Sequence, residues 1–336
     1  PTIRAVVVTW RGSDSIVACI DSLLQQEVDA DLEVLVVDNA SDDGTAELLA
    51  GFGSRILVRR MARNLGFAGG VARGTDDCPS DFILLLNDDA TLEKNALQEL
   101  LRFALAPGSR RVGAVAAQIL LAGKYSAVAS GTTGALVRSD GVHFSPDPSG
   151  DLLVNSTGSQ LDRAGRGSDR DWLVPIDMAS RNPEVFGFCG GATLLRAAAL
   201  QEVGGFDRDL FLYYEDTDVS WRLRARGWTV AYCSQAVAHH RHASSSGVES
   251  AVFRYYNTRN ALRVAVRYAP FFVIARAWAR AGAGAVRAMV RREPTWLERW
   301  RGMRDALTTV PEDLRVRSHW ATPERDAAAD RFVGAS

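Results

Sequence analysis

A short apolar run, Phe82–Leu86, constrains the fold of this chain more than any other feature. A run of this length, bounded by polar residues, predicts a buried strand of a parallel sheet. It leads into Asn87-Asp88-Asp89, and the carboxyl end of such a strand is where open α/β sheets bind ligands. Two neighbouring acids without an adjacent Lys or Arg attract a cation, and hard oxygen ligands suit Mg²⁺ or Mn²⁺. The sequence therefore predicts a metal–phosphate site at this strand end.

Strands and helices alternate through the first third of the chain. The expected strands are Ile3–Thr9, Leu32–Val37, Arg55–Arg59, Asp81–Leu86 and Val112–Ala117, and the expected helices are Ser15–Leu24, Asp42–Leu49, one opening at Ala68–Arg73, and Leu92–Leu105. This alternation predicts an α/β fold with a mostly parallel, doubly wound central sheet flanked by helices.

The pattern changes after residue 120. Residues 125–183 are rich in Gly, Ser, Asp and Pro, and a structureless loop of that length is uncommon, so we expect short strands or an acceptor-binding insertion. Beyond it the sequence predicts a strand with central glycines at Val185–Leu195, helices at Ala197–Val203 and Thr217–Arg226, and a strand at Thr229–Tyr232. The chain from Glu249 should be mostly helical, with a frayed tail over about the last dozen residues. We therefore divide the chain at residues 1–120, 121–248 and 249–336.

Composition excludes several classes of protein. The 39 basic and 40 acidic side chains nearly cancel, so bulk charge gives no case for nucleic-acid binding. The four cysteines are widely separated without a CxxC pair, which argues against a disulfide framework or a zinc site and favours a reducing cytosol. No run reaches the roughly 18 apolar residues that span a bilayer, and no signal peptide is expected at the start. A cytoplasmic location is the prediction, with any membrane association peripheral.

The stretch Arg254–Arg304 departs from this balance, because it is rich in arginine and poor in acids. A basic, aromatic helical segment can lie on an anionic membrane surface. It can equally be a solvated face that packs its aromatic side chains on the body of the protein. The residues concerned are Arg263, Arg267, Arg276, Arg280, Arg287, Arg291 and Arg292, with Tyr268, Phe271, Phe272, Trp278, Trp296 and Trp300 between them.

Two more clusters follow strands in the first third. Asp38 ends the second strand, where a carboxylate can accept a hydrogen bond from a base N–H or a ribose hydroxyl, while Asp42 and Asp43 fit cap and turn chemistry better. The glycines of Arg63–Gly70 precede a helix N-terminus and allow close approach to a phosphate or base. This cluster matches neither the dinucleotide fingerprint nor the P-loop.

Two clusters in the second half carry acids and histidines. Glu215 and Asp216 follow an aromatic segment at a predicted helix N-terminus, where an acid can serve as a general base or simply cap the helix. In His239-His240-Arg241-His242, positions 240 and 242 share a face of a strand. Neutral imidazoles bind Mn²⁺ beside carboxylates, although core or surface histidines are the plainer alternative.

In this order, from Val6 to about Asn260, the clusters resemble the inverting family-2 glycosyltransferases of the GT-A fold. Val8-Thr9-Trp10 is similar to the family's first-strand end, Asn87-Asp88-Asp89 to its D-x-D metal motif, and Glu215-Asp216 to its ED motif. Tyr256-x-x-Arg259-Asn260 is similar to members that build bacterial cell-surface polysaccharides. The resemblance makes residues 1–120 the nucleotide-sugar-binding half, 121–248 the acceptor-binding and catalytic half, and 249–336 a helical extension.

The resemblance also implies roles for single residues. Asp216 is the expected base with Glu215 beside it, and Asp89 and His240 are the expected ligands of Mn²⁺ or Mg²⁺, with His242 as the alternative to His240. Asp38 is expected to read a pyrimidine base. The nucleotide-binding residues are Thr9, Trp10, Asp38, Asn39, Arg63, Asn64, Gly66, Gly70, Asn87 and Asp88, and the residues that could line the sugar or acceptor site, or equally the core, are Tyr213, Tyr214 and Trp221.

Asn87 departs from the family pattern, because it stands where the first acid of D-x-D is expected. An amide is a weaker metal ligand than a carboxylate, so Asn87 is expected to contact the ribose or reach the ion through water, with Asp88 pointing away. Asn at this position resembles the rhamnosyltransferase-like branch, which implies dTDP-rhamnose as donor.

The expected function is therefore a metal-dependent, inverting hexosyltransferase that moves a sugar from a dTDP- or UDP-sugar to a hydroxyl of a glycan or polyprenyl-linked acceptor. Galactofuranosyl or other hexosyl transfer from a UDP-sugar is the alternative, and a degenerate carbohydrate-binding or scaffold protein is an alternative of another class. A nucleotidyltransferase would need a glycine-rich basic loop after the first strand, and Thr9-Trp10-Arg11-Gly12-Ser13 is too poor in glycine. Location at the inner face of the plasma membrane, through the basic helices, and a homodimer are further hypotheses.

Overall fold

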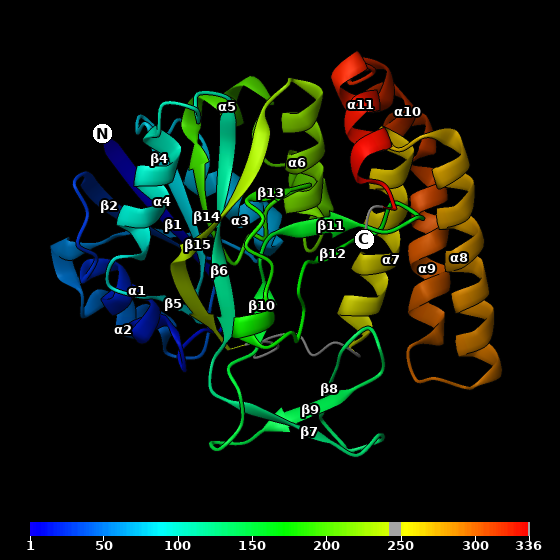
Figure 1. The fold of residues 1–336 in the computed structure, drawn as a ribbon, viewed down its shortest axis with the longest axis horizontal. Helices are drawn as coiled ribbons and strands as arrows, with labels where there is room; N and C mark the ends of the chain where they lie inside the picture. The colour runs from blue at the N-terminus through cyan, green and yellow to red at the C-terminus, as the bar shows by residue number, and fades with distance from the viewer. Residues whose placement is uncertain (242–249, 335–336) are drawn as a thin grey trace.

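The computed structural model describes residues 1–241 and 250–334, which form a central ten-stranded sheet, smaller sheets and surrounding helices (Figure 1). One half of the central sheet is parallel, in the order β4-β1-β2-β3. These strands are β1 (Thr2–Thr9), β2 (Asp31–Asp38), β3 (Leu57–Arg60) and β4 (Phe82–Asn87). Thr9 pairs with Asp38 and Val8 with Asn87, so the predicted strand ends meet at one edge.

The other half of the sheet is mixed. β14 runs antiparallel between β4 and β6, and β15 runs parallel to β6 on the far side. β13 and β5 pair antiparallel with β15, and β10 pairs antiparallel with β6. Both halves of the chain thus contribute to one sheet. The bounds are β5 (Ala90–Leu92), β6 (Val112–Leu121), β10 (Val154–Ser156), β13 (Glu184–Val185), β14 (Ala192–Arg196) and β15 (Thr229–His240).

Two predictions about element bounds were wrong. The expected strand Val185–Leu195 is split into β13 and β14, because its glycines bend the chain closely around neighbouring elements: a Cβ on Gly187 would lie 2.5 Å from Ser220 Oγ. The helix expected from Leu92 begins only at Ala96, because residues 90–92 pair with the end of β15.

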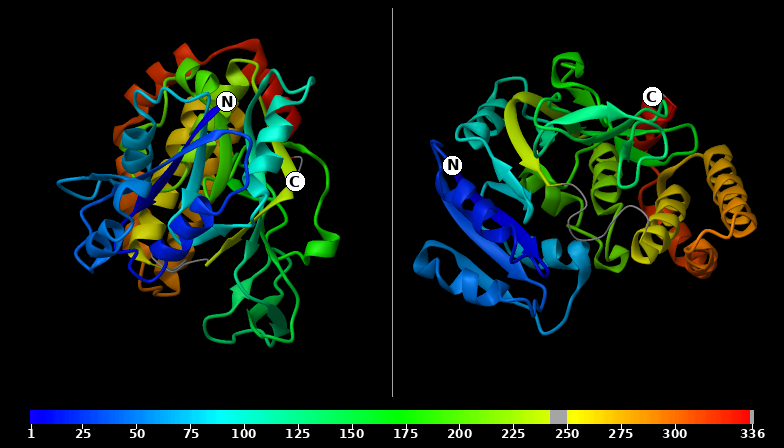
Figure 2. Two further views of the ribbon diagram at one scale, coloured as in Figure 1. Left: turned by 90° about the vertical axis from the view of Figure 1, so that its left-hand side faces the viewer. Right: turned by 90° about the horizontal axis from the view of Figure 1, so that it is seen from below.

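Helices cover both faces of the sheet, as the doubly wound pattern predicts (Figures 1 and 2). Alternation along β1 separates two cores: Ile3, Ala5 and Val7 pack in the core that includes α1 and α4, whereas Val6 and Val8 pack in the core that includes α3, α5 and α6. The bounds are α1 (Ile16–Leu24), α2 (Thr45–Ala50), α3 (Gly66–Thr75), α4 (Ala96–Leu105), α5 (Ala197–Glu202) and α6 (Glu215–Ala225), with short 3₁₀ turns at η1 (Gly53–Arg55), η2 (Ile176–Met178) and η3 (Arg208–Leu210).

The irregular stretch contains short strands, as expected. β7 (Tyr125–Val128), β8 (Leu136–Val137) and β9 (His143–Pro146) form a small sheet that extends below the central sheet in Figure 1. β11 (Ser159–Leu161) and β12 (Gly167–Asp169) form a hairpin. This hairpin lies against the start of α6, because a Cβ on Gly167 would come within 2.8 Å of Thr217 Oγ1.

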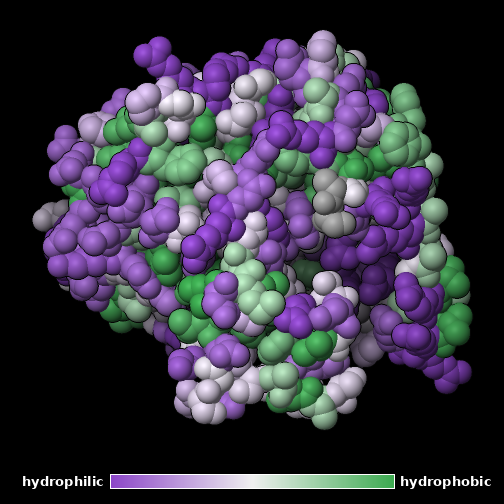
Figure 3. Space-filling model, viewed as in Figure 1, coloured by the Kyte–Doolittle hydropathy of each residue, from purple (hydrophilic) through white to green (hydrophobic). Residues whose placement is uncertain are grey.

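The C-terminal region is helical and stands beside the sheet (Figure 1). Its helices are α7 (Ala251–Tyr268), α8 (Phe271–Val290), α9 (Trp296–Thr308), α10 (Val310–His319) and α11 (Pro323–Phe332). α11 occupies most of the expected frayed tail. Among the described residues, no helix is both long and apolar enough to span a bilayer. Hydrophilic and hydrophobic side chains are interspersed on the face shown in Figure 3.

Buried ion pairs join this helical region to the sheet domain. Arg267 of α7 lies 3.2 Å from Asp218 Oδ1 of α6 and 2.6 Å from Asp313 Oδ1 of α10, and Arg263 also contacts Asp313. All four side chains are buried. Arg263 and Arg267 are therefore unavailable to a membrane surface, which corrects part of the expectation for the basic stretch.

Candidate active site

Asn87, Asp89 and His240 come together at the end of β4, as the sequence predicts. His240 Nε2 lies 2.9 Å from Asp89 Oδ1 and 3.3 Å from Asn87 Nδ2. The contact arises because residues 90–92 of β5 pair with residues 238–240 of β15. His242 lies outside the described residues.

Asn155 fixes the ring of His240. Its Oδ1 lies 2.8 Å from His240 Nδ1, and an acceptor there places the ring proton on Nδ1. The lone pair of Nε2 then faces Asp89 Oδ1 and can also accept a hydrogen bond from Asn87 Nδ2, so an imidazole nitrogen and a carboxylate oxygen lie where a cation could be held by both. A metal-binding histidine usually donates its other ring N–H to such a partner.

This donor set fits a divalent cation that is only partly coordinated by protein. An imidazole nitrogen and a carboxylate oxygen suit Mn²⁺, and further ligands would come from water and phosphate oxygens. Within residues 1–241 and 250–334, no three His, Cys, Asp or Glu side chains gather into a metal cluster. A pocket lined in part by Asp89, Thr91 and His239 borders the site.

Asp88 faces the loop after β1. A Cβ on Gly12 would lie 2.6 Å from Asp88 Oδ2 and 2.3 Å from Thr9 Oγ1, so the three residues are packed together. Burial raises the pKa of Asp88 to about 6.

Asp38 is fully buried at the end of β2. Its Oδ1 accepts a hydrogen bond from Ser41 N at 2.9 Å, and its Oδ2 lies 3.6 Å from Arg60 Nε. Oδ2 accepts no hydrogen bond from the described residues. A buried carboxylate oxygen normally has such a donor, so Asp38 is suited to accept one from a ligand.

The predicted glycine cluster contacts protein rather than open space, which corrects the reason given for its glycines. Gly66 has φ +72°, and a Cβ there would lie 2.1 Å from Phe211 O. A Cβ on Gly70 would lie 2.4 Å from Val8 Cγ1. Asn64 Oδ1 accepts from Gly66 N at 2.7 Å, and Asn39 Nδ2 donates to Gly66 O at 2.9 Å. Asn39 and Asn64 therefore hold the loop in place.

The outer residues of the predicted nucleotide site are exposed. Trp10 is 41% exposed, and the Arg11 guanidinium lies 5.1 Å from its ring centroid. Arg63 is also exposed. Arg11 pairs with Asp42 at 2.7 Å, and Asp43 accepts from Ser13 N and Thr45, so both acids have the cap and turn roles that the sequence favoured.

Asp216 is the more accessible acid of the ED pair. Its Oδ2 accepts from Gly190 N at 3.3 Å and its Oδ1 from Thr217 N at 2.6 Å. Burial raises its pKa, and the nearby charge of Asp169 raises it further. Glu215 is buried, its Oε2 has no hydrogen-bond partner among the described residues, and burial followed by the charge of Asp216 raises its pKa. Asp216 is therefore the more exposed carboxylate of the pair, and Glu215 is buried beside it.

The sequence did not reveal Asp169, Cys189 or Asn155. Asp169 lies on the β11–β12 hairpin, where it hydrogen-bonds Ser156 and Cys189 and interacts electrostatically with His240 and Asp216. Burial raises the pKa of both the Asp169 carboxyl and the Cys189 thiol. No local signal marks these residues, because long-range strand pairing brings them to the site.

Trp221 packs in the core, which is the second of the two alternatives that the sequence left open for it. It is 1% exposed, its ring stacks on Tyr268, and its edge contacts Phe186 at a centroid distance of 5.0 Å. Tyr214 is also buried. Tyr213 is half-buried and packs against Phe253, so it is the aromatic residue of this set with accessible surface.

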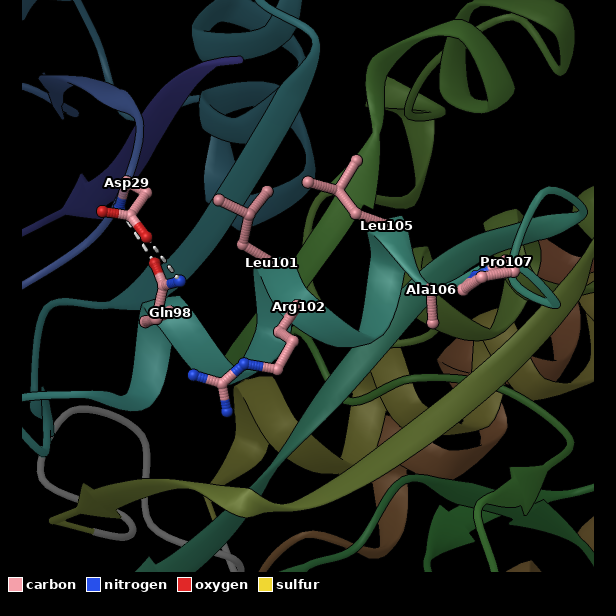
Figure 4. Close-up of a pocket in the computed structure, with 7 residues that line it drawn as sticks. All are labelled: Asp29, Gln98, Leu101, Arg102, Leu105, Ala106 and Pro107. Carbon is pink, nitrogen blue, oxygen red and sulfur yellow. Dashed lines mark hydrogen bonds between the residues drawn. The ribbon is translucent and has the colours of Figure 1, made fainter.

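A larger pocket lies away from these residues (Figure 4). It is formed by α4 and the loop before β2, where Gln98 and Asp29 exchange hydrogen bonds. Its lining contains none of the predicted site residues.

Two family models match the chain. The model described as Glycosyl transferase family 2 matches residues 5–120, and the model described as Glycosyl transferase family group 2 matches residues 159–302. The first range contains Asp38 and Asp89, and the second contains Asp169, Asp216 and His240.

Individual proteins agree with these matches. The chain is 25% identical over 248 residues to the N-acetylglucosaminyl-diphospho-decaprenol L-rhamnosyltransferase of Mycobacterium tuberculosis, covering 66% of this chain and 70% of the relative. Its structure is similar to that of GalNAc-T7 with UDP, GalNAc and Mn²⁺, with a TM-score of 0.56 and 14% identity over 96% of this chain and 58% of that one. The match therefore spans less than two thirds of the GalNAc-T7 chain.

A second solved structure is similar over most of both chains. It is the mannosyltransferase PcManGT from Pyrobaculum calidifontis in complex with GDP-Man and Mn²⁺, with a TM-score of 0.53 and 16% identity, covering 98% of this chain and 86% of that one. At such identities the structural matches establish the fold alone, which is the GT-A fold. Because both halves of the chain match the family and the fold agrees, the chain belongs to glycosyltransferase family 2 and is a glycosyltransferase.

Proposed function

We propose that this chain is a metal-dependent, inverting glycosyltransferase that transfers rhamnose from dTDP-rhamnose to a hydroxyl of a glycan or polyprenyl-linked acceptor. The observation that carries the proposal is the 2.9 Å approach of His240 Nε2 to Asp89 Oδ1 at the strand edge that also holds Asp38. This arrangement suits a cation beside a nucleotide diphosphate.

Asp89 and His240 would hold Mn²⁺ or Mg²⁺, and Asn155 would keep the imidazole in the required tautomer. The bound ion would offset negative charge on the departing diphosphate. Asn87, with its amide beside His240, is placed to reach the donor directly or through water. The mannosyltransferase and GalNAc-T7 structures, which contain Mn²⁺, favour a metal of this kind.

The nucleotide would lie over the ends of β1 and β2. Asp38 would accept a hydrogen bond from a pyrimidine N–H through its buried Oδ2, while Trp10 and Arg63 offer exposed side chains near the rim. The strand-end loop held by Asn39 and Asn64 would shape this part of the pocket. These contacts favour a dTDP- or UDP-linked donor.

Asp216 would accept the proton of the acceptor hydroxyl as that oxygen attacks the anomeric carbon. Hydrogen bonds from Gly190 N and from the backbone and hydroxyl of Thr217 orient the carboxylate, and its raised pKa makes it a better proton acceptor. One displacement assisted by one base inverts the anomeric centre.

The sugar and acceptor are assigned by relationship. The Mycobacterium tuberculosis relative is named for rhamnosyl transfer to a decaprenol-linked acceptor, and Asn87 supports the same branch. The wider role would be assembly of a bacterial cell-surface polysaccharide. Galactofuranosyl or other hexosyl transfer from a UDP-sugar is the alternative for the same site.

A membrane-linked acceptor would place the enzyme at the inner face of the plasma membrane. α8 leaves Phe271 72% and Phe272 59% exposed, and Arg276, Arg287 and Arg291 lie on the exposed part of the same segment. Arg276 lies 5.3 Å from the Phe272 ring centroid, and an exposed segment that carries both phenylalanines and arginines suits an anionic lipid surface. This surface supports peripheral contact with a membrane. It does not bear on the hypothesis of a homodimer.

The test is transfer from a panel of dTDP- and UDP-sugars with Mn²⁺ or Mg²⁺, comparing wild type, Asp216→Asn and Asp209→Asn. Asp209 is an exposed acid shortly before the base and serves as the matched control. We expect metal-dependent transfer that Asp216→Asn lowers by about 10²–10⁴-fold while Asp209→Asn preserves it. The absence of both metal-dependent dTDP binding and donor hydrolysis would instead support a degenerate carbohydrate-binding or scaffold protein.

A further inference from the structure

The turn that leads into the ED motif has an unusual backbone. Phe211, Tyr213 and Tyr214 have φ angles of 64°, 67° and 71°, all in the left-handed region that bulky side chains disfavour. Helix α6 begins at Glu215, immediately after them. Such a turn persists only where surrounding contacts hold it, so its contacts decide where the first residues of α6 lie.

Asn260 of α7 provides these contacts from outside the turn. Its Nδ2 donates to Leu210 O at 2.9 Å, Leu212 O at 2.9 Å and Tyr213 O at 2.8 Å. Asn260 is fully buried. A single amide group thus gathers three carbonyl oxygens of one turn, which a hydrocarbon side chain of equal size cannot do.

The other side of the turn is held by the nucleotide-binding half. Ala68 N, at the start of α3, donates to Phe211 O at 3.1 Å. Gly66 permits this approach, since a side chain there would meet the same carbonyl. The turn is therefore clamped between α3 and α7, and the helical extension takes part in building the active site.

We propose that Asn260 is a positioning residue for Asp216: its amide holds the turn at residues 210–214 so that α6 starts with Asp216 on the N–H of Gly190. This inference rests on the proposed role of Asp216 as the base. Without the amide, the three left-handed residues can relax toward favoured angles, and the first turn of α6 rotates with them. Asp216 then leaves the Gly190 N–H, while the ends of β1, β2 and β4 stay in place.

The experiment compares Asn260→Leu with wild type in the full chain. We expect kcat to fall by at least tenfold, with donor KM and the calorimetric affinity for dTDP and Mn²⁺ changed by less than threefold. The acid limb of the pH–rate profile should move to higher pH, because Asp216 loses a hydrogen bond that favours its charged form. A variant that merely reduced the folded fraction would lower the rate without moving that limb.

Ala265→Gly is the matched control, because Ala265 is buried in the same helix and packs with Ala269 and Val273. It should weaken α7 while preserving kcat and the pH profile. If Asn260→Leu does not fold, Asn260→Ser, which keeps one donor, carries the test with the same measurements.

An unchanged kcat in a folded Asn260 variant, or a loss that Ala265→Gly reproduces, overturns the inference. Failure of the proposed function gives a different result. In that case Asp216→Asn itself keeps full activity, whatever happens at Asn260.

Discussion

His240 Nε2 lies 2.9 Å from Asp89 Oδ1, although the two residues are 151 positions apart and belong to different halves of the chain. The short strand β5 makes this contact, because it begins directly after Asp89 and pairs with the last residues of β15. The pairing of β5 with β15 therefore fixes Asp89 and His240 relative to each other. A metal site between them would be preorganised by the fold.

Asn155 should control metal affinity without binding the metal. Asn155→Ala removes the acceptor at His240 Nδ1, so the ring can rotate or change tautomer. Loss of such a partner typically lowers metal affinity about 10–100-fold. We expect the Mn²⁺ concentration for half-maximal transfer to rise by that factor, while Asn182→Ala, at an exposed position, leaves it unchanged. An unchanged Mn²⁺ requirement in Asn155→Ala would contradict the role of His240.

The pH dependence of transfer should report Asp216. Burial and the charge of Asp169 raise the pKa of Asp216 to about 6, and the base must be unprotonated. Activity should therefore fall as the pH decreases through about 6. Asp169→Asn removes a negative charge, so the limb should move to lower pH, whereas Asp177→Asn, exposed in the same insertion, should not shift it. If the acid limb of the pH–rate profile stays in place in Asp169→Asn, the charge of Asp169 does not affect the pKa of the base.

Glu215 should make stability depend on pH in the opposite sense to an ordinary paired carboxylate. Its pKa is raised to about 8 in the folded chain by burial and by Asp216. The folded state then binds a proton that the unfolded state has released, so stability declines as pH rises from the ordinary carboxyl range through about 8. Glu215→Gln should have a higher Tm than wild type at pH 9 and a smaller advantage at pH 5.

Glu47→Gln is the control for that comparison, since Glu47 is exposed in the first turn of α2. Its Tm difference from wild type should not vary between the two pH values. An equal Tm difference for Glu215→Gln at pH 5 and pH 9 would mean that Glu215 is not held protonated.

The exposed aromatic residues of α8 should govern any contact with lipid. Phe271→Ser combined with Phe272→Ser should reduce co-sedimentation with vesicles that contain anionic lipid at least severalfold, because both apolar insertion and the nearby arginines contribute. Val137→Ser, at an exposed apolar position of the small sheet, is the control. If wild type and the double variant sediment equally with the vesicles, Phe271 and Phe272 do not mediate membrane contact.

The parts of this site that could be predicted from sequence are set by local pattern. The run Phe82–Leu86 is a buried strand because its length and composition admit little else, and register then brings Asn87 and Asp38 to one edge. His240 could be paired with Asp89 only through the family resemblance. The order of motifs along the chain gives no distance between them.

The parts that could not be predicted depend on long-range packing. Trp221 lies in the same helix as Asp216, yet it faces a core completed by Tyr268, more than forty residues later. Asp169 and Asn155 lie in an irregular stretch whose short strands are positioned by pairing partners elsewhere. The sequence identified Gly66 as a position of close approach. It could not show that the approaching group is the carbonyl of Phe211.

The anomeric configuration of the product tests the central claim most directly. Wild-type enzyme would be incubated with Mn²⁺, the donor found in the sugar-nucleotide panel and its acceptor, and the new linkage read by NMR, with Asp216→Asn measured in parallel. A single displacement assisted by Asp216 predicts inversion of the anomeric centre, together with loss of transfer in Asp216→Asn at unchanged nucleotide affinity. Retention of configuration, or full transfer by Asp216→Asn, would contradict the account.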